Sequence, residues 1–157
     1  MHKDIIEWGA VFSDNRKYRY SLRRIWDRNK PMIMFIGLNP STANETTDDP
    51  TIRRVIRFAK DWGYGGVYMT NLFGIISSNP KILKTDNNPI GENDIWLGNI
   101  SKLCTEIVFA WGNFEEAIER GKEVTKMFPN AKVLGKNKNG SPKHPLYIKS
   151  NVILQHQ

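Results

Sequence analysis

The segment Met32-Ile33-Met34-Phe35-Ile36-Gly37-Leu38-Asn39-Pro40-Ser41-Thr42 decides the fold of this chain. Residues 32–36 form a continuous apolar run, which is typical of a strand buried on both faces of a sheet. Gly37 ends the run, and Asn39-Pro40-Ser41 has the composition of a turn. The segment therefore predicts a central strand that carries a polar loop at its carboxyl end.

The sequence on both sides of this segment alternates between strand and helix patterns. Further strands are expected at 67–72, 107–111 and 131–134, and helices at 50–62, 90–103 and 114–127. Asp49 and Pro50 are a typical N-cap and first helical residue. A β-hairpin is expected at 10–22. The pattern predicts an α/β fold: a three-layer α/β/α sandwich with a mostly parallel, four-stranded central sheet plus an N-terminal β-hairpin.

Length and composition restrict the class of protein. A chain of 157 residues is expected to form a single domain over 1–157, with a core large enough to need no disulfide. Cys104 is the one cysteine, so an intrachain disulfide is impossible and a thiolate metal site is disfavoured. No apolar stretch approaches the roughly 18 residues of a membrane span, and no signal peptide is recognisable. We expect a cytoplasmic protein without membrane contact, bound metal or cofactor.

The charge is unevenly distributed. The chain has 23 basic and 16 acidic residues, for a net charge of +7. Residues 16–30 contain seven basic residues and one acid, and residues 120–149 contain eight and one, so the remainder is net acidic. Two basic segments on an acidic body indicate a polyanionic partner. An ordinary solvated basic surface is the alternative.

The loops after the four expected core strands carry the polar side chains that chemistry needs. Because the carboxyl ends of parallel strands meet at one edge of a sheet, these loops are expected to meet there too. They contain amides, which read nucleobase edges, aromatic rings, which stack on bases, and lysines, which bind phosphates. Each has a simpler explanation as well: Asn39 and Asn71 could belong to ordinary turns, Trp111 to the core, and His144 to the surface.

The order of these loops resembles the uracil-DNA glycosylase superfamily. The residues that carry this resemblance are Gly37-Leu38-Asn39-Pro40, Asp48-Asp49-Pro50-Thr51, Tyr68-Met69-Thr70-Asn71, Val108-Phe109-Ala110-Trp111-Gly112 with Ala117, and His144-Pro145. More specifically, the chain is similar to the bacterial and phage family called domain of unknown function 1643. That similarity rests on Tyr18-Arg19-Tyr20, Leu38 to Ala43, Asp48 to Thr51, Asn71-Leu72-Phe73 and His144 to Tyr147.

The superfamily resemblance implies a uracil-DNA glycosylase-like fold and hydrolysis of an N-glycosidic bond of a normal or modified base, in nucleic acid or in a nucleotide. It implies that His144 donates to a carbonyl oxygen of the leaving base and that Asn71 reads the base edge. It also implies that Asn39 positions water or the base. The water would be activated by Asp48 or Asp49. The remaining expected ligand-binding residues are Gly37, Leu38, Pro40, Ser41, Thr42, Phe73, Trp111, Lys143 and Tyr147. Arg19, Arg23 and Arg53 are the expected phosphate-binding residues.

This sequence departs from the superfamily pattern in two places. Asn39 stands where the fastest uracil enzymes have an aspartate, and His144-Pro145-Leu146-Tyr147 lacks their serine-bearing loop. A non-catalytic module that binds a nucleotide-type ligand or nucleic acid in the same pocket is therefore a second hypothesis. A phosphate-directed hydrolase, with Glu45, Asp48 and Asp49 as candidate metal ligands, is a third.

Overall fold

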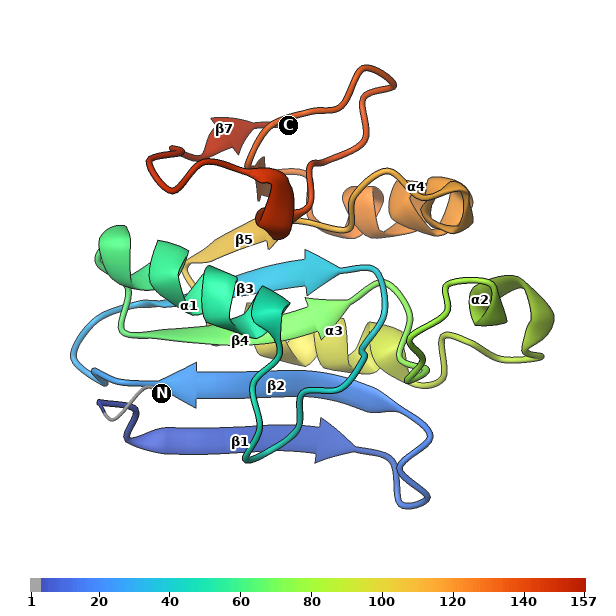
Figure 1. The fold of residues 1–157 in the computed structure, drawn as a ribbon, viewed down its shortest axis with the longest axis horizontal. Coiled ribbons are helices and arrows are strands. Elements are labelled where there is room, and N and C mark those ends of the chain that lie inside the picture. Colours follow the sequence, from blue (N-terminus) through green and yellow to red (C-terminus); the bar gives the residue numbers. More distant parts are fainter. Residues whose placement is uncertain (1–3) are drawn as a thin grey trace.

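A computed structural model of the chain describes residues 4–157 and contains one mixed sheet of seven strands (Figure 1). The strand order is β1-β2-β4-β3-β5-β6-β7. The strands are β1 (Glu7–Phe12), β2 (Arg19–Ile25), β3 (Met32–Gly37), β4 (Gly66–Asn71), β5 (Glu106–Phe109), β6 (Lys132–Val133) and β7 (Gln155–His156). The α-helices are α1 (Pro50–Asp61), α2 (Ile82–Thr85), α3 (Asn93–Ser101) and α4 (Ile118–Met127), and the 3-10 helices are η1 (Glu115–Ala117) and η2 (Pro145–Tyr147).

The mixed α/β class is confirmed, but the sheet has seven strands rather than four and is not mostly parallel. The four predicted core strands do run parallel, in the order β4-β3-β5-β6. Three of the six pairings in the full sheet are nevertheless antiparallel. The physical reason lies at the two edges: the N-terminal hairpin pairs through β2 with β4, and the chain end folds back as β7 against β6.

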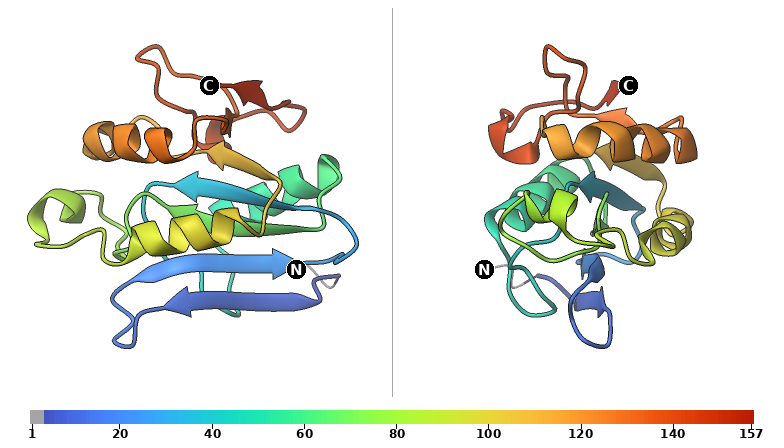
Figure 2. Two further views of the ribbon diagram at one scale, coloured as in Figure 1. Left: turned by 180° about the vertical axis from the view of Figure 1, so that it is seen from behind. Right: turned by 90° about the vertical axis from the view of Figure 1, so that its right-hand side faces the viewer.

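Helices cover both faces of the sheet, as the two views of Figure 2 show for α1 and α3. β3 is the cause of this arrangement, since its apolar side chains alternate between two clusters. Ile33 and Phe35 pack with the buried residues of α1, whereas Met34 and Ile36 pack with those of α3 and α4. None of the helices within residues 4–157 is long and apolar enough to span a bilayer.

The start of α1 follows directly from its sequence. Asp49 is the N-cap: its Oδ1 accepts a hydrogen bond of 2.9 Å from the Ile52 amide, and Pro50 occupies the first turn. The register of β3 against β4 sets Gly37, the last residue of β3, beside Asn71, the last residue of β4. Both features bring predicted site residues to the carboxyl edge of the parallel strands.

Candidate functional site

A cavity of about 250 Å³ lies at the carboxyl ends of β3 and β4. The structure brings together nine of the predicted site residues in its lining: Arg19, Gly37, Leu38, Asn39, Pro40, Ser41, Asp49, Asn71 and His144. The lining residues that the sequence analysis missed are Thr51, Ile52, Met69, Ser77, Ser78, Pro80 and Phe114. We call this space the edge pocket.

Asn71 is the most informative residue of the edge pocket. The residue is only 3% exposed, yet its Nδ2 atom has no hydrogen-bond partner within residues 4–157. Its backbone carbonyl is fixed by a 2.6 Å hydrogen bond from Asn93 Nδ2. Gly37 leaves room for the amide, because a Cβ there would lie 2.8 Å from Asn71 Oδ1. Buried polar atoms almost always have partners, so an unpartnered amide at a cavity is suited to a ligand.

His144 reaches the edge pocket from the turn before η2. Its Nδ1 atom accepts a 3.2 Å hydrogen bond from the Leu146 amide, so a neutral ring carries its proton on Nε2. Burial lowers the pKa of His144 below its usual value, and the Asp49 carboxylate opposes part of this shift. The ring is therefore a neutral Nε2–H donor near neutral pH. Gly112 (φ +81) lies beside it in the left-handed conformation, and a Cβ there would be in ordinary contact with that of His144 at 3.4 Å.

Asn39 offers the pocket an acceptor. Its Nδ2 atom donates to the backbone carbonyls of Ser77 (2.9 Å) and Ile75 (3.3 Å). These bonds attach the β3 loop to the segment after β4 and consume the donors of the amide. Oδ1 is the polar atom of this side chain left for a ligand or a water molecule.

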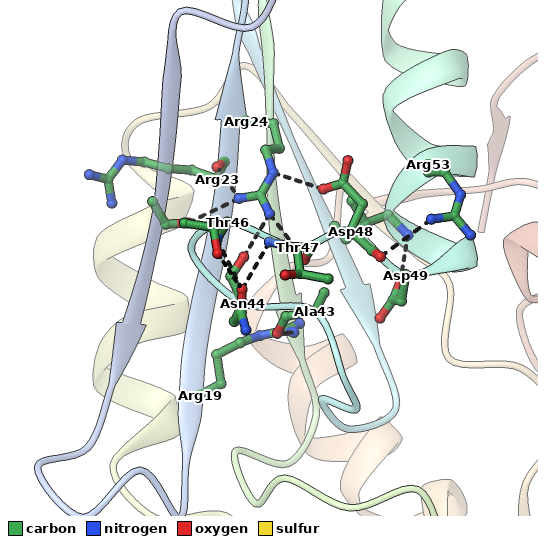
Figure 3. Close-up of polar contacts among 12 residues, drawn as sticks. Arg19, Arg23, Arg24, Ala43, Asn44, Thr46, Thr47, Asp48, Asp49 and Arg53 are labelled. Carbon is green, nitrogen blue, oxygen red and sulfur yellow. Dashed lines mark hydrogen bonds and ion pairs between the residues drawn. The ribbon is translucent and has the colours of Figure 1, made fainter. Parts of the chain in front are cut away.

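Arg19 is almost fully buried beside the edge pocket. Its Nη1 atom donates to the Ala43 carbonyl at 2.8 Å, whereas its Nε atom has no partner in the described part of the chain (Figure 3). Burial lowers the pKa of Arg19 to about 10, and the nearby Asp49 carboxylate partly offsets this shift. Arg19 and Asp49 thus place opposite charges next to the same small space.

Asp48 points away from the edge pocket into a buried ion pair. Arg24, which is 0% exposed, donates from Nε to Asp48 Oδ1 at 2.9 Å and from Nη2 to the Asn44 carbonyl at 2.6 Å (Figure 3). Glu45 pairs with Arg16 at 3.0 Å. Within residues 4–157 no three His, Cys, Asp or Glu side chains gather closely enough to hold a metal ion. The candidate metal ligands of the phosphate-directed hydrolase therefore already have other partners. Glu45 and Asp48 are paired with arginines, and Asp49 caps α1.

The structure places the other predicted site residues outside the edge pocket. Phe73 and Trp111 are 6% and 5% exposed and belong to the core, where Trp111 lies 4.6 Å from Phe109 between ring centroids. Arg23 pairs with Glu7, Arg53 donates to the Asp48 carbonyl, and Thr42 is exposed on the loop. Lys143 and Tyr147 line a neighbouring space of about 330 Å³ that also includes His144 and Phe114.

Phe114 is the aromatic residue at this site that the sequence analysis missed. It is 37% exposed and lines both the edge pocket and the neighbouring space. Phe114 lies two residues after Gly112, in the loop that follows β5. Because the loops after the core strands were expected to meet at the site, this position could have identified it as a site residue. The lining residues Ser77, Ser78 and Pro80 come from a long loop with no such pattern.

These observations define a mixed α/β protein with a small polar pocket at the carboxyl edge of its parallel strands. The chain belongs to the family described as protein of unknown function (DUF1643), whose model matches residues 19–146. The matched region contains every residue that lines the edge pocket. The searches of curated proteins and of solved structures found no match to the chain.

Proposed function

We propose that this protein recognises a nucleobase in the edge pocket and hydrolyses its N-glycosidic bond, in nucleic acid or in a nucleotide. The uracil-DNA glycosylase-like layering of the fold is part of the same proposal. Support for the layering comes from the order of the parallel strands and from the meeting of their loops at one edge. The unpartnered, buried amide of Asn71 is the observation that carries the functional proposal.

The polar atoms of the pocket match the edge of an oxo-base. Asn71 Nδ2, Arg19 Nε and His144 Nε2 are donors, and Asn39 Oδ1 is an acceptor. A base with carbonyl oxygens beside a ring N–H presents the complementary pattern. A volume of about 250 Å³ is suited to a single small ring system and not to a whole dinucleotide.

The charges of the pocket favour a neutral group over a phosphate. Asp49 lies close enough to affect the pKa values of both Arg19 and His144. A phosphate in the same space would be attracted by Arg19 but repelled by this carboxylate, and His144, which is neutral near pH 7, adds no positive charge. This balance supports base recognition rather than the phosphate-directed hydrolase.

The residues also suit the charge that develops as the glycosidic bond breaks. The leaving base becomes anionic and the sugar becomes oxocarbenium-like, so a donor is needed at the base and a negative charge near the sugar. His144 Nε2–H supplies the donor at a base carbonyl oxygen. Asp49 supplies the negative charge and an oxygen for the proton of the attacking water, whose oxygen becomes bonded to the sugar carbon.

One observation favours the second hypothesis, a module that binds without cleaving. Asp49 Oδ1 already accepts from the Ile52 amide, and Asp48 is held by Arg24, so neither carboxylate is wholly free to act as a base. Asn39 in the first loop cannot take a proton at neutral pH. The same pocket would then retain the base in its intact nucleotide.

A single assay separates the two hypotheses. The protein is incubated with a nucleotide panel and with single- and double-stranded oligonucleotides that contain uracil, hypoxanthine or modified pyrimidines, and released base is measured by mass spectrometry. The proposal expects release that is lost in His144→Ala and Asp49→Asn but retained in Lys102→Gln, a remote surface variant. Binding without release by the wild-type protein would establish the binding module. Neither binding nor release of any substrate would refute both.

A further inference from the structure

A cavity of about 680 Å³ lies next to the edge pocket and is not used by the proposed function. It runs along α4 and the loop 135–142, at the carboxyl ends of β5 and β6. Its floor consists of apolar side chains, among them Trp111, Ala117 and Val133. We call it the α4 groove.

The side chains that line the α4 groove are basic or neutral. Lys122, Lys126 and Lys136 line it, and none of the lining residues is acidic. On α4, Ile118, Lys122, Thr125 and Lys126 lie on the groove side, whereas Glu119 and Glu123 are absent from the lining. This separation of charge along one short helix creates a positive groove on a helix of balanced composition.

Several lysines around the α4 groove are free to bind a partner. Lys126, Lys136 and Lys143 form no ion pair within residues 4–157, and Lys122 pairs only with the highly exposed Glu119. The N-terminal basic segment behaves differently: Arg16, Lys17, Arg23, Arg24 and Arg28 are in ion pairs and Arg19 is buried, which leaves only the exposed Lys30 without an ion pair within the described residues. A cluster of unpaired positive charge therefore lies beside α4.

The α4 groove and the edge pocket share Phe114 in their linings. Phe114 also lines the 330 Å³ space, which has lining residues in common with both and which Lys143 and Tyr147 line as well. Phe114, Ile118 and Tyr147 are 37%, 51% and 83% exposed. Exposed rings beside free lysines are the combination that binds single-stranded nucleic acid, because bases stack on the rings while lysines hold the phosphates.

We infer that the α4 groove binds the single strand that flanks the base held in the edge pocket. This inference rests on the proposed function and adds its substrate class: a base within a polynucleotide, not a free nucleotide. A base must leave its stack to enter a pocket of this size, and a strand unpaired around it offers further bases to Phe114 and Tyr147. The phosphates then lie against Lys122, Lys126, Lys136 and Lys143.

The test measures binding of a 5′-fluorescein-labelled 12-nucleotide oligothymidylate containing one deoxyuridine, by fluorescence anisotropy between 50 and 200 mM salt. Four phosphate contacts predict a slope of log affinity against log salt of about −2.8, which is roughly a 50-fold loss over this range. Lys126→Gln/Lys136→Gln is expected to reduce the slope to about −1.4. Lys30→Gln/Lys102→Gln, which alters two exposed lysines away from all three spaces, is the matched control and should keep the wild-type slope.

The outcomes distinguish this inference from the proposed function. A reduced slope in the groove variant alone supports the inference, whether or not base is released. Equal slopes in the groove variant and the control would overturn it, even if base release persists. Competition by unlabelled deoxyuridine monophosphate at the same concentration as the 12-mer would also overturn it, because a free nucleotide would then match the strand. Loss of base release in all proteins would overturn only the proposed reaction.

Discussion

Asn71→Ala is expected to weaken ligand binding without weakening the fold. An unpartnered buried amide costs about 1–3 kcal/mol, whereas the few carbon and polar atoms removed contribute roughly 1 kcal/mol of packing at a cavity wall. The variant should therefore be as stable as the wild-type protein or up to about 2 kcal/mol more stable. Loss of a base contact should reduce affinity by about 5- to 150-fold, which corresponds to 1–3 kcal/mol.

Asn93→Ala is the matched control, because Asn93 is a similarly buried asparagine whose Nδ2 atom is paired, although its Oδ1 atom has no partner within residues 4–157. Its Nδ2 atom donates to the carbonyls of Asn71 (2.6 Å) and Leu72 (3.1 Å). Removing these two bonds should destabilise the fold by about 2–4 kcal/mol. The two substitutions remove the same atoms, so the difference between them compares a paired Nδ2 in Asn93 with an unpaired Nδ2 in Asn71.

Urea unfolding of the two variants and the wild-type protein measures both effects. The binding change is measured with the oligonucleotide that the wild-type protein retains. The reasoning is refuted if Asn71→Ala loses more than about 1 kcal/mol of stability, since the amide would then have a partner in the free protein. It is equally refuted if the variant binds as tightly as the wild-type protein.

Four further predictions concern charge and ionisation. Asp48→Ala should destabilise the fold by about 3–5 kcal/mol in urea unfolding, because Arg24 is left as a buried, uncompensated charge; a catalytic Asp48 would instead lower turnover with little change in stability. Burial lowers the pKa of His144, so the unfolded chain takes up a proton first and stability should fall as the pH drops below about 6.5. Asp49→Asn should lower the His144 pKa further, as measured by NMR titration. Burial raises the pKa of Cys104 to about 12, so at pH 8 its reaction with a thiol reagent should be about 10³-fold slower than that of a free cysteine.

The core strands and the first helix could be predicted because their signals are local. β3 is expected at 32–36 and found at Met32–Gly37, and α1 begins at Pro50 behind an Asp49 cap as its sequence indicates. β7 could not be predicted, because Gln155 and His156 have no strand pattern and join the sheet only by pairing with β6. The same long-range pairing explains the error in strand direction.

The site could be predicted only as far as strand order determines it. Loops that follow parallel strands must meet, which is why Asn39, Asn71 and His144 line one cavity. Ion pairs between residues far apart in sequence leave no such pattern. Arg24 and Asp48 are 24 positions apart, so charge counts could not predict that this pair is buried. For the same reason they could not predict that most basic residues of the N-terminal segment are paired with acidic residues.

The contrast between Arg24 and Arg19 shows why the unsatisfied donors point to a ligand. Both arginines lie on β2 and are buried, and the fold satisfies Arg24 with a carboxylate and several carbonyl oxygens. The chain thus has the means to satisfy a buried guanidinium in this region. Arg19 Nε and Asn71 Nδ2 are left without partners, and both residues line the edge pocket. Since each open donor costs about 1–3 kcal/mol, a bound group that accepts from both is the simplest physical reason for keeping them.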